Sequence, residues 1–407
     1  MKPDDICPRP SHVPPLSTRP HSPPIYLTSV WECDSPEQAD ALLGGAGYRD
    51  ADASRSPGTR SPEIGHVYQR DSQPNADLLA AKCRALHGAE RGVVTSSGTS
   101  ALSVALLALM KQGDEAVVGS RVYGKTLTLF GSEAARLGIQ AKVVDTLDLQ
   151  AVEGALTERT RLLVVETIAN PLLQVADLRA LADLAHRRGA LLLVDNTFAS
   201  PIVCRPLELG ADLVMESLTK TMNGHSDVIL GFLGGKAEHW GRVPGVISTW
   251  GFNPPPFECW LALRGLATAH LRIERACENA LVIAEALAKR PEIARVDYPG
   301  LATNKDRSLA ERQFARGRFG TMVTFHLRGG RSGADAFIAA AKEIPFCPSL
   351  GELSTTLSHP ETTSHRGLTA EQRASLDITG GTIRLSVGTE SQEHLLAALE
   401  EALKAVR

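Results

Sequence analysis

A lysine flanked by hydroxyl side chains follows an apolar run near the middle of the 407-residue chain. Leu213 and Val214 lead into Ser217, Thr219 and Lys220. A lysine amine can act as a covalent catalyst when it forms an imine with a carbonyl group and later exchanges it. The neighbouring hydroxyl groups would suit an aldehyde cofactor that carries a phosphate. Taken alone, however, the pattern is more typical of a helix cap followed by a solvated lysine.

A carboxylate stands at the end of another apolar run. Asp195 directly follows residues 191–194, all of them aliphatic. An unpaired carboxylate is costly to bury, so a partner is expected there. A protonated pyridine nitrogen would be one such partner, and the pair would make the ring an electron sink. An aspartate that caps the loop after a buried strand is the alternative.

A hydroxyl-rich segment could bind a phosphate. Ser97, Gly98 and Thr99 lie between the apolar residues 93–95 and a predicted helix. Backbone N–H groups at a helix start, helped by hydroxyl groups, form an anion site. The segment lacks the lysine of a nucleotide-binding P-loop, which disfavours nucleoside triphosphates. A simple helix cap would have the same composition.

Two more polar positions follow apolar runs. Tyr123 comes after residues 116–118, and Asn170 comes after residues 162–165. A tyrosine ring could stack on a planar cofactor, and an amide could hydrogen-bond to a phenolic oxygen. Each residue by itself is more typical of a structural role.

Short apolar runs that alternate with amphipathic segments predict the elements that position these residues. Such a pattern is typical of a mostly parallel sheet covered by helices on both faces, with ligands at the carboxyl ends of the strands. Strands are predicted over residues 93–95, 116–118, 142–144, 162–165, 191–194, 213–214, 228–233, 321–327 and 382–387. Helices are predicted over residues 101–110, 126–137, 177–188, 260–289 and 393–406.

The length of the chain predicts more than one domain. Residues 1–66 are interpreted as an extended N-terminal arm with a polar loop over residues 49–65, because no sustained periodicity runs through them. A large domain is expected over residues 67–257 and a C-terminal domain over residues 258–407.

Composition excludes several classes of protein. The net charge is -3 and no long basic run occurs, which argues against nucleic acid as a partner. No apolar stretch is long enough to span a bilayer, and the N-terminus lacks the apolar core of a signal peptide. Seven scattered cysteines without a C-x-x-C pair favour reduced thiols in the cytoplasm over disulfides or a metal site.

Taken in order, the motifs resemble the Cys/Met-metabolism family of pyridoxal-phosphate enzymes, which includes cystathionine γ-lyase, cystathionine γ-synthase and methionine γ-lyase. The resemblance runs from about Pro24 to the C-terminus. The motifs that carry it are residues 195–198, 205–212, 217–220, 224–227, 260–266, 349–351, 359–360 and 384–388. The resemblance implies the PLP-dependent transferase fold type I (aspartate aminotransferase-like): a mostly parallel seven-stranded sheet flanked by helices, and a smaller α/β C-terminal domain.

The resemblance also implies roles for individual residues. Lys220 would hold pyridoxal 5'-phosphate as a Schiff base and then move protons between substrate carbons, with Tyr123 stacking on the ring and assisting. Asp195 would pair with the ring nitrogen, and Asn170 would contact the phenolic oxygen. The residues expected to hold the phosphate are Ser97, Gly98, Thr99, Ser217 and Thr219.

Other implied roles concern the substrate and a second subunit. Arg384 would bind the substrate α-carboxylate as a bidentate fork, with Ser349 nearby. Tyr68 and Arg70 match a Tyr-x-Arg motif that reaches the phosphate of the neighbouring subunit. A homodimer that shares its active sites is therefore expected, and the resemblance implies a tetramer.

The resemblance leaves the reaction open among three possibilities. A C–S lyase that acts on sulfur amino acids by β- or γ-elimination comes first, because residues 349–360 resemble the γ-lyase branch. γ-Replacement on an activated homoserine is the second, and an aminotransferase-like or specialised enzyme for an unusual amino acid is the third. Lys125, Thr128 and Pro348 depart from the family pattern and leave the far end of the substrate undefined.

Overall fold

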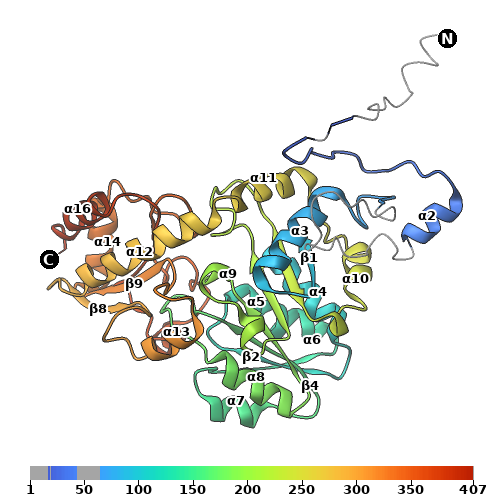
Figure 1. Ribbon diagram of the computed structural model, residues 1–407. Helices are drawn as coiled ribbons and strands as arrows, with labels where there is room; N and C mark the ends of the chain where they lie inside the picture. The colour runs from blue at the N-terminus through green and yellow to red at the C-terminus, as the bar shows by residue number, and fades with distance from the viewer. Residues whose placement is uncertain (1–16, 19, 44–64, 407) are drawn as a thin grey trace.

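Two β-sheets, each covered by helices, organise the protein (Figure 1). The computed structural model describes residues 17–18, 20–43 and 65–406. The large sheet contains β1 (Arg91–Thr95), β2 (Glu115–Gly119), β3 (Gln140–Val144), β4 (Thr160–Glu166), β5 (Leu191–Asp195), β6 (Leu213–Ser217) and β7 (Gly231–Gly235). The small sheet contains β8 (Ile293–Asp297), β9 (Met322–Leu327), β10 (Thr356–Ser358) and β11 (Thr382–Ser386).

The large sheet is mostly parallel, with the strand order β1-β7-β6-β5-β4-β2-β3. Only β7 runs against its neighbours β1 and β6. Alternate residues of β4 face opposite cores: Leu163 and Val165 point to one, Leu162 and Val164 to the other. Both faces must therefore be covered by helices, which is why the strands are almost uniformly apolar. The predicted seven-stranded, mostly parallel sheet is confirmed.

Helices pack on both faces of this sheet. The residues of α3 (Pro74–His87) and α8 (Leu178–Arg187) join one core, and those of α4 (Gly98–Leu109) and α10 (Val243–Trp250) join the other. The helix α4 begins at Ser97 with a capping box, in which the Ser97 and Ser100 side chains each bond to the other's backbone N–H. The other large-domain segments are α5 (Gly124–Thr128), the π-turn η2 (Leu129–Glu133), α6 (Ala134–Arg136), α7 (Leu149–Ala155), α9 (Ser200–Val203), η3 (Pro206–Leu209) and η4 (Ala237–His239).

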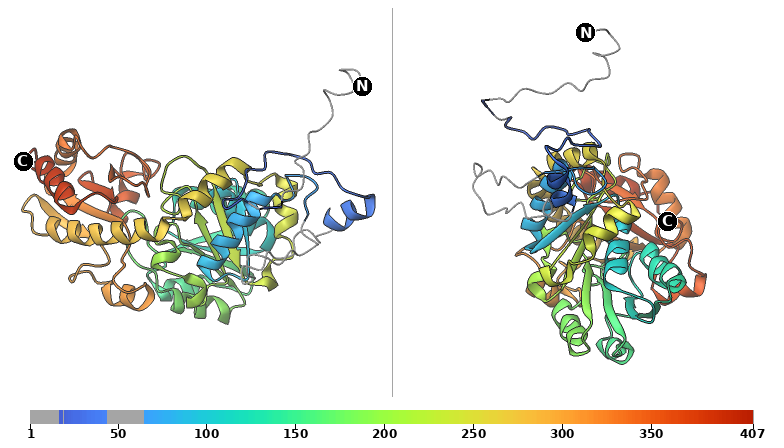
Figure 2. Two further views of the ribbon diagram at one scale, coloured as in Figure 1. Left: turned by 45° about the horizontal axis from the view of Figure 1, so that its top comes forward. Right: turned by 90° about the vertical axis from the view of Figure 1, so that its right-hand side faces the viewer.

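The small sheet forms a smaller domain together with the C-terminal helices. Its four strands are antiparallel in the order β10-β11-β9-β8. Its helices are α13 (Arg307–Gln313), α14 (Gly330–Ala340), α15 (Ala370–Ser375) and α16 (Gln392–Leu403). The helix α12 (Ala269–Leu287) runs from the large sheet to this domain (Figure 2) and its buried residues join the core shared by both.

One long helix over residues 260–289 was expected, and this prediction is wrong. The structure has two helices, α11 (Pro256–Leu266) and α12. The Gly265 carbonyl accepts a hydrogen bond from Arg272 at 2.9 Å, and Thr268 Oγ1 accepts one from Arg272 Nε at 3.2 Å. These side-chain bonds connect the last turn of α11 to the first turn of α12, across the residues that separate the two helices.

The N-terminal arm also contains a helix that the sequence pattern did not indicate. The helix α2 spans Pro36–Leu43, and Ser35 Oγ accepts a hydrogen bond from the Gln38 backbone N–H at 3.2 Å. This helix has eight residues, about two turns, which is too short to show a clear periodicity. The predicted polar loop over residues 49–65 lies outside the described residues except for Gly65. The predicted helix over residues 126–137 is present as the continuous run of α5, η2 and α6, within which residues 129–133 form a π-helical turn.

Candidate active site

The carboxyl ends of three neighbouring strands gather the predicted site residues. Glu166 on β4 lies opposite Asp195 on β5, and Asp195 lies opposite Met215 on β6, two residues before Ser217. Parallel strands end on the same edge of a sheet, so their last side chains and the loops that follow are close together. The structure therefore brings these residues together at the edge where the sequence predicts a ligand.

Lys220 is half-buried in the loop after β6 and reaches the small domain. Its Nζ donates a hydrogen bond to Ser349 Oγ at 2.9 Å. Burial lowers the pKa of the Lys220 amine, and the positive charge of Arg384 lowers it further. A lowered pKa increases the share of neutral amine, which is the form that attacks a carbonyl carbon.

Arg384 connects the two domains across the same site. It lies buried on β11; its Nη1 donates to Asn170 Oδ1 at 2.7 Å, and its Nη2 donates to the Ser349 carbonyl at 3.0 Å. Burial lowers the pKa of the guanidinium to about 10, so it stays charged at neutral pH. Its Nε is buried without a partner among the described residues. A buried cation with an unused donor is equipped to bind an anion.

The start of α4 and the end of β6 form a narrow cradle. Gly98 lies so close to Ser217 that a Cβ atom at Gly98 would come within 2.9 Å of Ser217 Cβ and 3.1 Å of Ser217 Oγ. The first N–H groups of α4 have no acceptor within the helix, because no earlier turn precedes them. Thr197 Oγ1 accepts the Ser217 N–H at 2.9 Å and so fixes the Ser217 side of the cradle. The cradle fits a phosphate group.

Thr99 and Thr219 are less clearly directed at this cradle. The Thr99 side chain is exposed. The Thr219 hydroxyl donates to the Leu230 carbonyl at 3.2 Å and accepts from the Leu230 N–H at 3.1 Å. Thr219 would have to exchange these bonds in order to contact a phosphate.

Two carboxyl groups lie side by side at the strand ends. Asp195 Oδ1 accepts the Thr197 N–H at 3.0 Å, and no basic side chain of the described residues forms an ion pair with Asp195. Glu166 Oε1 accepts the Tyr123 N–H at 2.6 Å, and its Oε2 is buried without a partner. Loss of hydration raises the pKa of both carboxyls, and the charge of Asp195 pushes the pKa of Glu166 well above its usual range. Of the two carboxyls, Glu166 therefore has the stronger tendency to keep its proton.

Tyr123 stands at the start of α5 with its ring largely exposed. The Glu166 carboxyl holds its backbone N–H, as described above. The backbone of Tyr123 is therefore held in place while its side chain is exposed, which suits stacking against a planar ligand.

Tyr68 and Arg70 lie apart from these residues. The Arg70 guanidinium sits 5.0 Å from the centre of the Tyr68 ring, and Tyr68 bridges to Val30 of the N-terminal arm. Within the described part of the chain, neither makes a hydrogen bond or ion pair to the residues around Lys220. A single chain therefore does not bring this predicted pair into the site.

Sequence reasoning missed three contributors. Glu166 follows an apolar strand just as Asp195 does, so its position could have indicated it. Thr197 bridges Asp195 and Ser217 through its backbone and its hydroxyl, as described above, and no spacing rule reveals that. His365 lies near Arg384, which together with burial lowers the His365 pKa to about 4. Its imidazole is therefore neutral at physiological pH.

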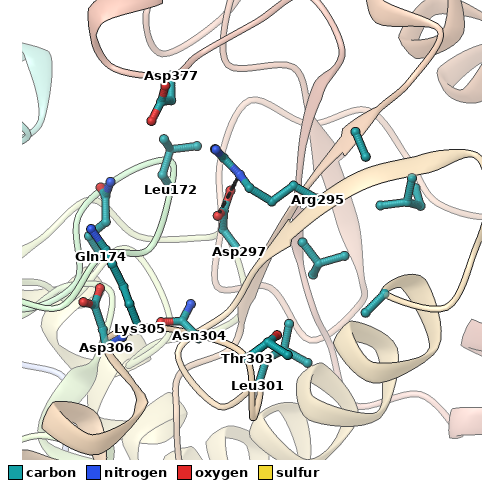
Figure 3. A pocket seen from close by; sticks show the side chains of 14 residues that line it. Leu172, Gln174, Arg295, Asp297, Leu301, Thr303, Asn304, Lys305, Asp306 and Asp377 are labelled. Carbon is teal, nitrogen blue, oxygen red and sulfur yellow. Dashed lines mark hydrogen bonds and ion pairs between the residues drawn. The ribbon is translucent and has the colours of Figure 1, made fainter.

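Another cavity of about 470 Å³ lies away from this site (Figure 3). It lies between Leu172 and Gln174 of the large domain and the strand β8 of the small domain. Arg295 pairs with Asp297 inside it, and Asp306 accepts the Val175 N–H at 3.2 Å. These charged groups are already paired, and none of the predicted site residues lines the cavity.

The residues at the strand ends fit pyridoxal phosphate. The Gly98–Ser217 cradle suits its phosphate, and Asp195 has no cation until a protonated ring nitrogen supplies one. Lys220 offers an amine of lowered pKa to its aldehyde. Over the described residues there is no cluster of side chains that could hold a metal ion. The helices of that same part of the chain include none with the length and apolar character needed to cross a membrane.

Comparisons with known proteins agree with this fit. A model of the Cys/Met metabolism PLP-dependent enzyme family matches residues 11–404. An L-methionine gamma-lyase of Porphyromonas gingivalis is 37% identical over 93% of this chain and 92% of its own. An O-succinylhomoserine sulfhydrylase of Pseudomonas aeruginosa is 38% identical over 91% and 92%. A crystal structure of cystathionine gamma synthase from Xanthomonas oryzae pv. oryzae, in complex with aminoacrylate and cysteine, is 35% identical, with a TM-score of 0.85 over 94% of this chain and 93% of that one.

Proposed function

Because the chain belongs to the Cys/Met metabolism PLP-dependent enzyme family, we propose that it cleaves C–S bonds of sulfur amino acids by β- or γ-elimination. The observation that carries the proposal is the hydrogen-bonded chain from Lys220 through Ser349 to Arg384. It sets a nucleophilic amine beside a buried guanidinium, which is the arrangement that an α-amino carboxylate needs.

The cofactor would be held by groups that end or follow five strands of the large sheet. Lys220 would bind its aldehyde carbon, Asp195 would pair with its ring nitrogen, and Ser97, Gly98 and Ser217 would hold its phosphate, helped by Thr99 and Thr219. Tyr123 would stack on the ring, and Asn170 would contact its phenolic oxygen. When bound, pyridoxal phosphate supplies an aldehyde for covalent attachment and a cationic ring that withdraws electrons from the substrate α-carbon.

The chain's own residues then direct the reaction. Arg384 binds the substrate α-carboxylate, and Ser349 orients the Lys220 amine toward the α-carbon. Released from the cofactor, Lys220 takes the α-proton and delivers a proton to a neighbouring carbon. The C–S bond breaks, the sulfur leaves as a thiol after protonation, and water completes the conversion to a 2-oxo acid and ammonia. Tyr123 is placed to assist these proton transfers.

Product analysis tests this reaction. Methionine and cystathionine are supplied separately, and the 2-oxo acid, ammonia and thiol released from each are measured. Equal amounts of the three products support elimination. Formation of an amino acid from an added 2-oxo acid, without ammonia, contradicts it and supports the aminotransferase-like alternative, which the departure from the family pattern at Lys125 favours.

γ-Replacement is the second candidate function. The relatives named as a sulfhydrylase and a synthase are as similar to this chain as the lyase is. Incubation with an activated homoserine ester and cysteine distinguishes the two reactions, because replacement yields a thioether and elimination yields ammonia. A thioether formed faster than ammonia would favour replacement.

Arg384→Lys is expected to weaken substrate binding. Lysine offers a point charge where the guanidinium donates to two partners at once. A hydrogen bond to a charged group contributes about 1.5–3 kcal/mol, so KM should rise about 10- to 100-fold. Steady-state kinetics measure this, with Arg295→Lys on β8 as the matched control. An unchanged KM would exclude Arg384 as the carboxylate site.

The active unit is proposed to be a homodimer with shared sites, assembled further into a tetramer. Tyr68 and Arg70 are exposed and lie outside their own chain's site, so a second copy could receive them. Val30, which pairs with Tyr68, is an exposed apolar residue that such an assembly could cover. Other exposed apolar side chains are Tyr26, Leu27, Leu78, Trp250 and Phe257. The free thiols of the described cysteines are compatible with the reducing cytoplasm, where we place the enzyme.

Mixed dimers are expected to regain activity. A Lys220→Ala subunit combined with an Arg70→Ala subunit contains one site with both native residues, if Arg70 acts across the interface. Purified heterodimers should then show roughly half of the wild-type turnover, although each parent is impaired. Differently tagged subunits allow the heterodimer to be isolated and assayed. If Arg70 acts within its own chain, the mixture gains nothing over the Arg70→Ala parent.

A further inference from the structure

A buried arginine, Arg272, forms hydrogen bonds to the backbone of the loop that follows Lys220. Arg272 on α12 donates from Nη1 to the Thr221 carbonyl at 2.9 Å and from Nη2 to the Met222 carbonyl at 2.8 Å. The same Nη2 donates to the Gly265 carbonyl at 2.9 Å, at the end of α11. Burial lowers the pKa of its guanidinium. Among the described residues it forms no ion pair, so backbone carbonyls and the Thr268 hydroxyl offset its charge.

Burial of a charge without a counter-ion removes its hydration, so this arrangement costs free energy of folding. The surroundings are shaped to accept it. A Cβ atom at Gly224 would lie 2.0 Å from Arg272 Nη1, and Gly224 adopts a φ of +77°. A side chain there would collide with the guanidinium and would also strain the backbone.

The opposite side of the loop is held by the small domain. A Cβ atom at Gly351 would lie 2.3 Å from Thr221 N and 2.7 Å from the Lys220 carbonyl carbon. The Leu353 N–H donates to the Gly224 carbonyl at 3.1 Å. The peptide after Lys220 is therefore enclosed between Arg272 and the segment that carries Ser349.

We propose that Arg272 is a positioning residue for the reaction: by holding the Thr221 and Met222 carbonyls, it fixes the Lys220 backbone so that the amine meets both the cofactor and Ser349. The inference rests on the proposed role of Lys220. It explains why a cation, and not an apolar side chain, occupies this place. A misplacement of about 1 Å in a catalytic group lowers turnover about 10²-fold.

The test compares Arg272→Met, Arg272→Lys and the control Arg275→Met, an exposed position on the same helix. In Arg272→Met we expect kcat per cofactor-loaded site to fall about 10- to 100-fold while KM stays nearly constant. Borohydride trapping of pyridoxal phosphate on Lys220 should slow in parallel. Arg272→Lys should recover part of the loss, because its ammonium still reaches one or two carbonyls.

Hydrogen exchange supplies a readout without cofactor. The Asn223 and Gly224 amides bond to the Leu218 and Lys220 carbonyls within this loop. In cofactor-free Arg272→Met they should exchange about tenfold faster than in Arg275→Met, because a bond to a charged group is lost. If Arg272→Met does not fold, the same comparison is made with Arg272→Lys.

Equal exchange and equal kcat per loaded site in the Arg272 and Arg275 variants would overturn the proposal and leave a purely structural arginine. Failure of the wild-type protein to bind pyridoxal phosphate would instead contradict the proposed function. The exchange experiment would still decide whether Arg272 orders the loop.

Discussion

Lys220→Ala is expected to reduce turnover by about 10⁴-fold or more, because one amine serves as the covalent anchor and as the proton carrier. The purified variant should lack the yellow absorbance that the wild-type protein shows with pyridoxal phosphate. Borohydride should leave no reduced cofactor attached to the chain. Mass spectrometry of the peptide that contains residue 220 measures this directly.

The exposed Lys289→Ala, at the end of α12, is the control and should retain full activity and colour. A small primary amine added to Lys220→Ala should restore part of the turnover, because it can take the α-proton in place of the side chain. Wild-type turnover in Lys220→Ala, or trapping at another lysine, would remove the basis of the proposed mechanism.

Asp195→Asn is expected to produce the second largest loss. The amide keeps the shape and can still accept the Thr197 N–H, but it cannot hold a ring nitrogen in its protonated form. Removal of one preorganised electrostatic contact lowers kcat about 10²- to 10³-fold. Stopped-flow and steady-state kinetics with the substrate found by product analysis give the value.

A cofactor analogue provides the discriminating control for Asp195. Pyridoxal phosphate methylated on its ring nitrogen carries a permanent positive charge, so it should restore much of the activity of Asp195→Asn. The exposed Asp183→Asn on α8 should behave as wild type with either cofactor. Equal impairment of Asp195→Asn with both cofactors would show that the carboxylate acts through something other than the ring nitrogen.

The sequence predicted the large sheet well for a physical reason. Strands buried on both faces leave uninterrupted apolar runs, and those runs predicted six of the strand positions to within about three residues at each end, which is the usual uncertainty of element boundaries. The seventh strand, β7, begins at Gly231, later than the apolar run at residue 228 suggested. Val228 and Leu230 are buried in the core but lie before the strand, so hydrophobicity alone misplaced its start.

Helix ends were harder to predict because individual side-chain hydrogen bonds decide them. The break between α11 and α12 depends on Arg272 bonding to the Gly265 carbonyl, and nothing local at Ala267 or Thr268 indicates it. The short helix α2 depends on its cap instead of on a buried face. In both cases hydrogen bonds override the periodicity that sequence reasoning uses.

The candidate site likewise contains residues that the sequence pattern indicated and residues that it did not. Residues that follow apolar strands, such as Asp195 and Ser217, could be found because parallel strands end at one edge. The meeting of Ser349 and Arg384 with Lys220 joins two domains, and only the family resemblance indicated it. Thr197 and His365 were missed, since their contribution lies in a hydrogen-bond bridge and in proximity to a charge.

Arg384 works as a latch between the two lobes of the molecule. One guanidinium holds Asn170 of the large lobe and Ser349 of the small one, and each such bond is worth about 1.5–3 kcal/mol. Swinging the lobes apart would have to break at least one of them, which disfavours the open form about tenfold or more before other contacts are counted. An anion that accepts a hydrogen bond from Arg384 Nε would bind while the bonds from Arg384 to Asn170 and Ser349 stay intact.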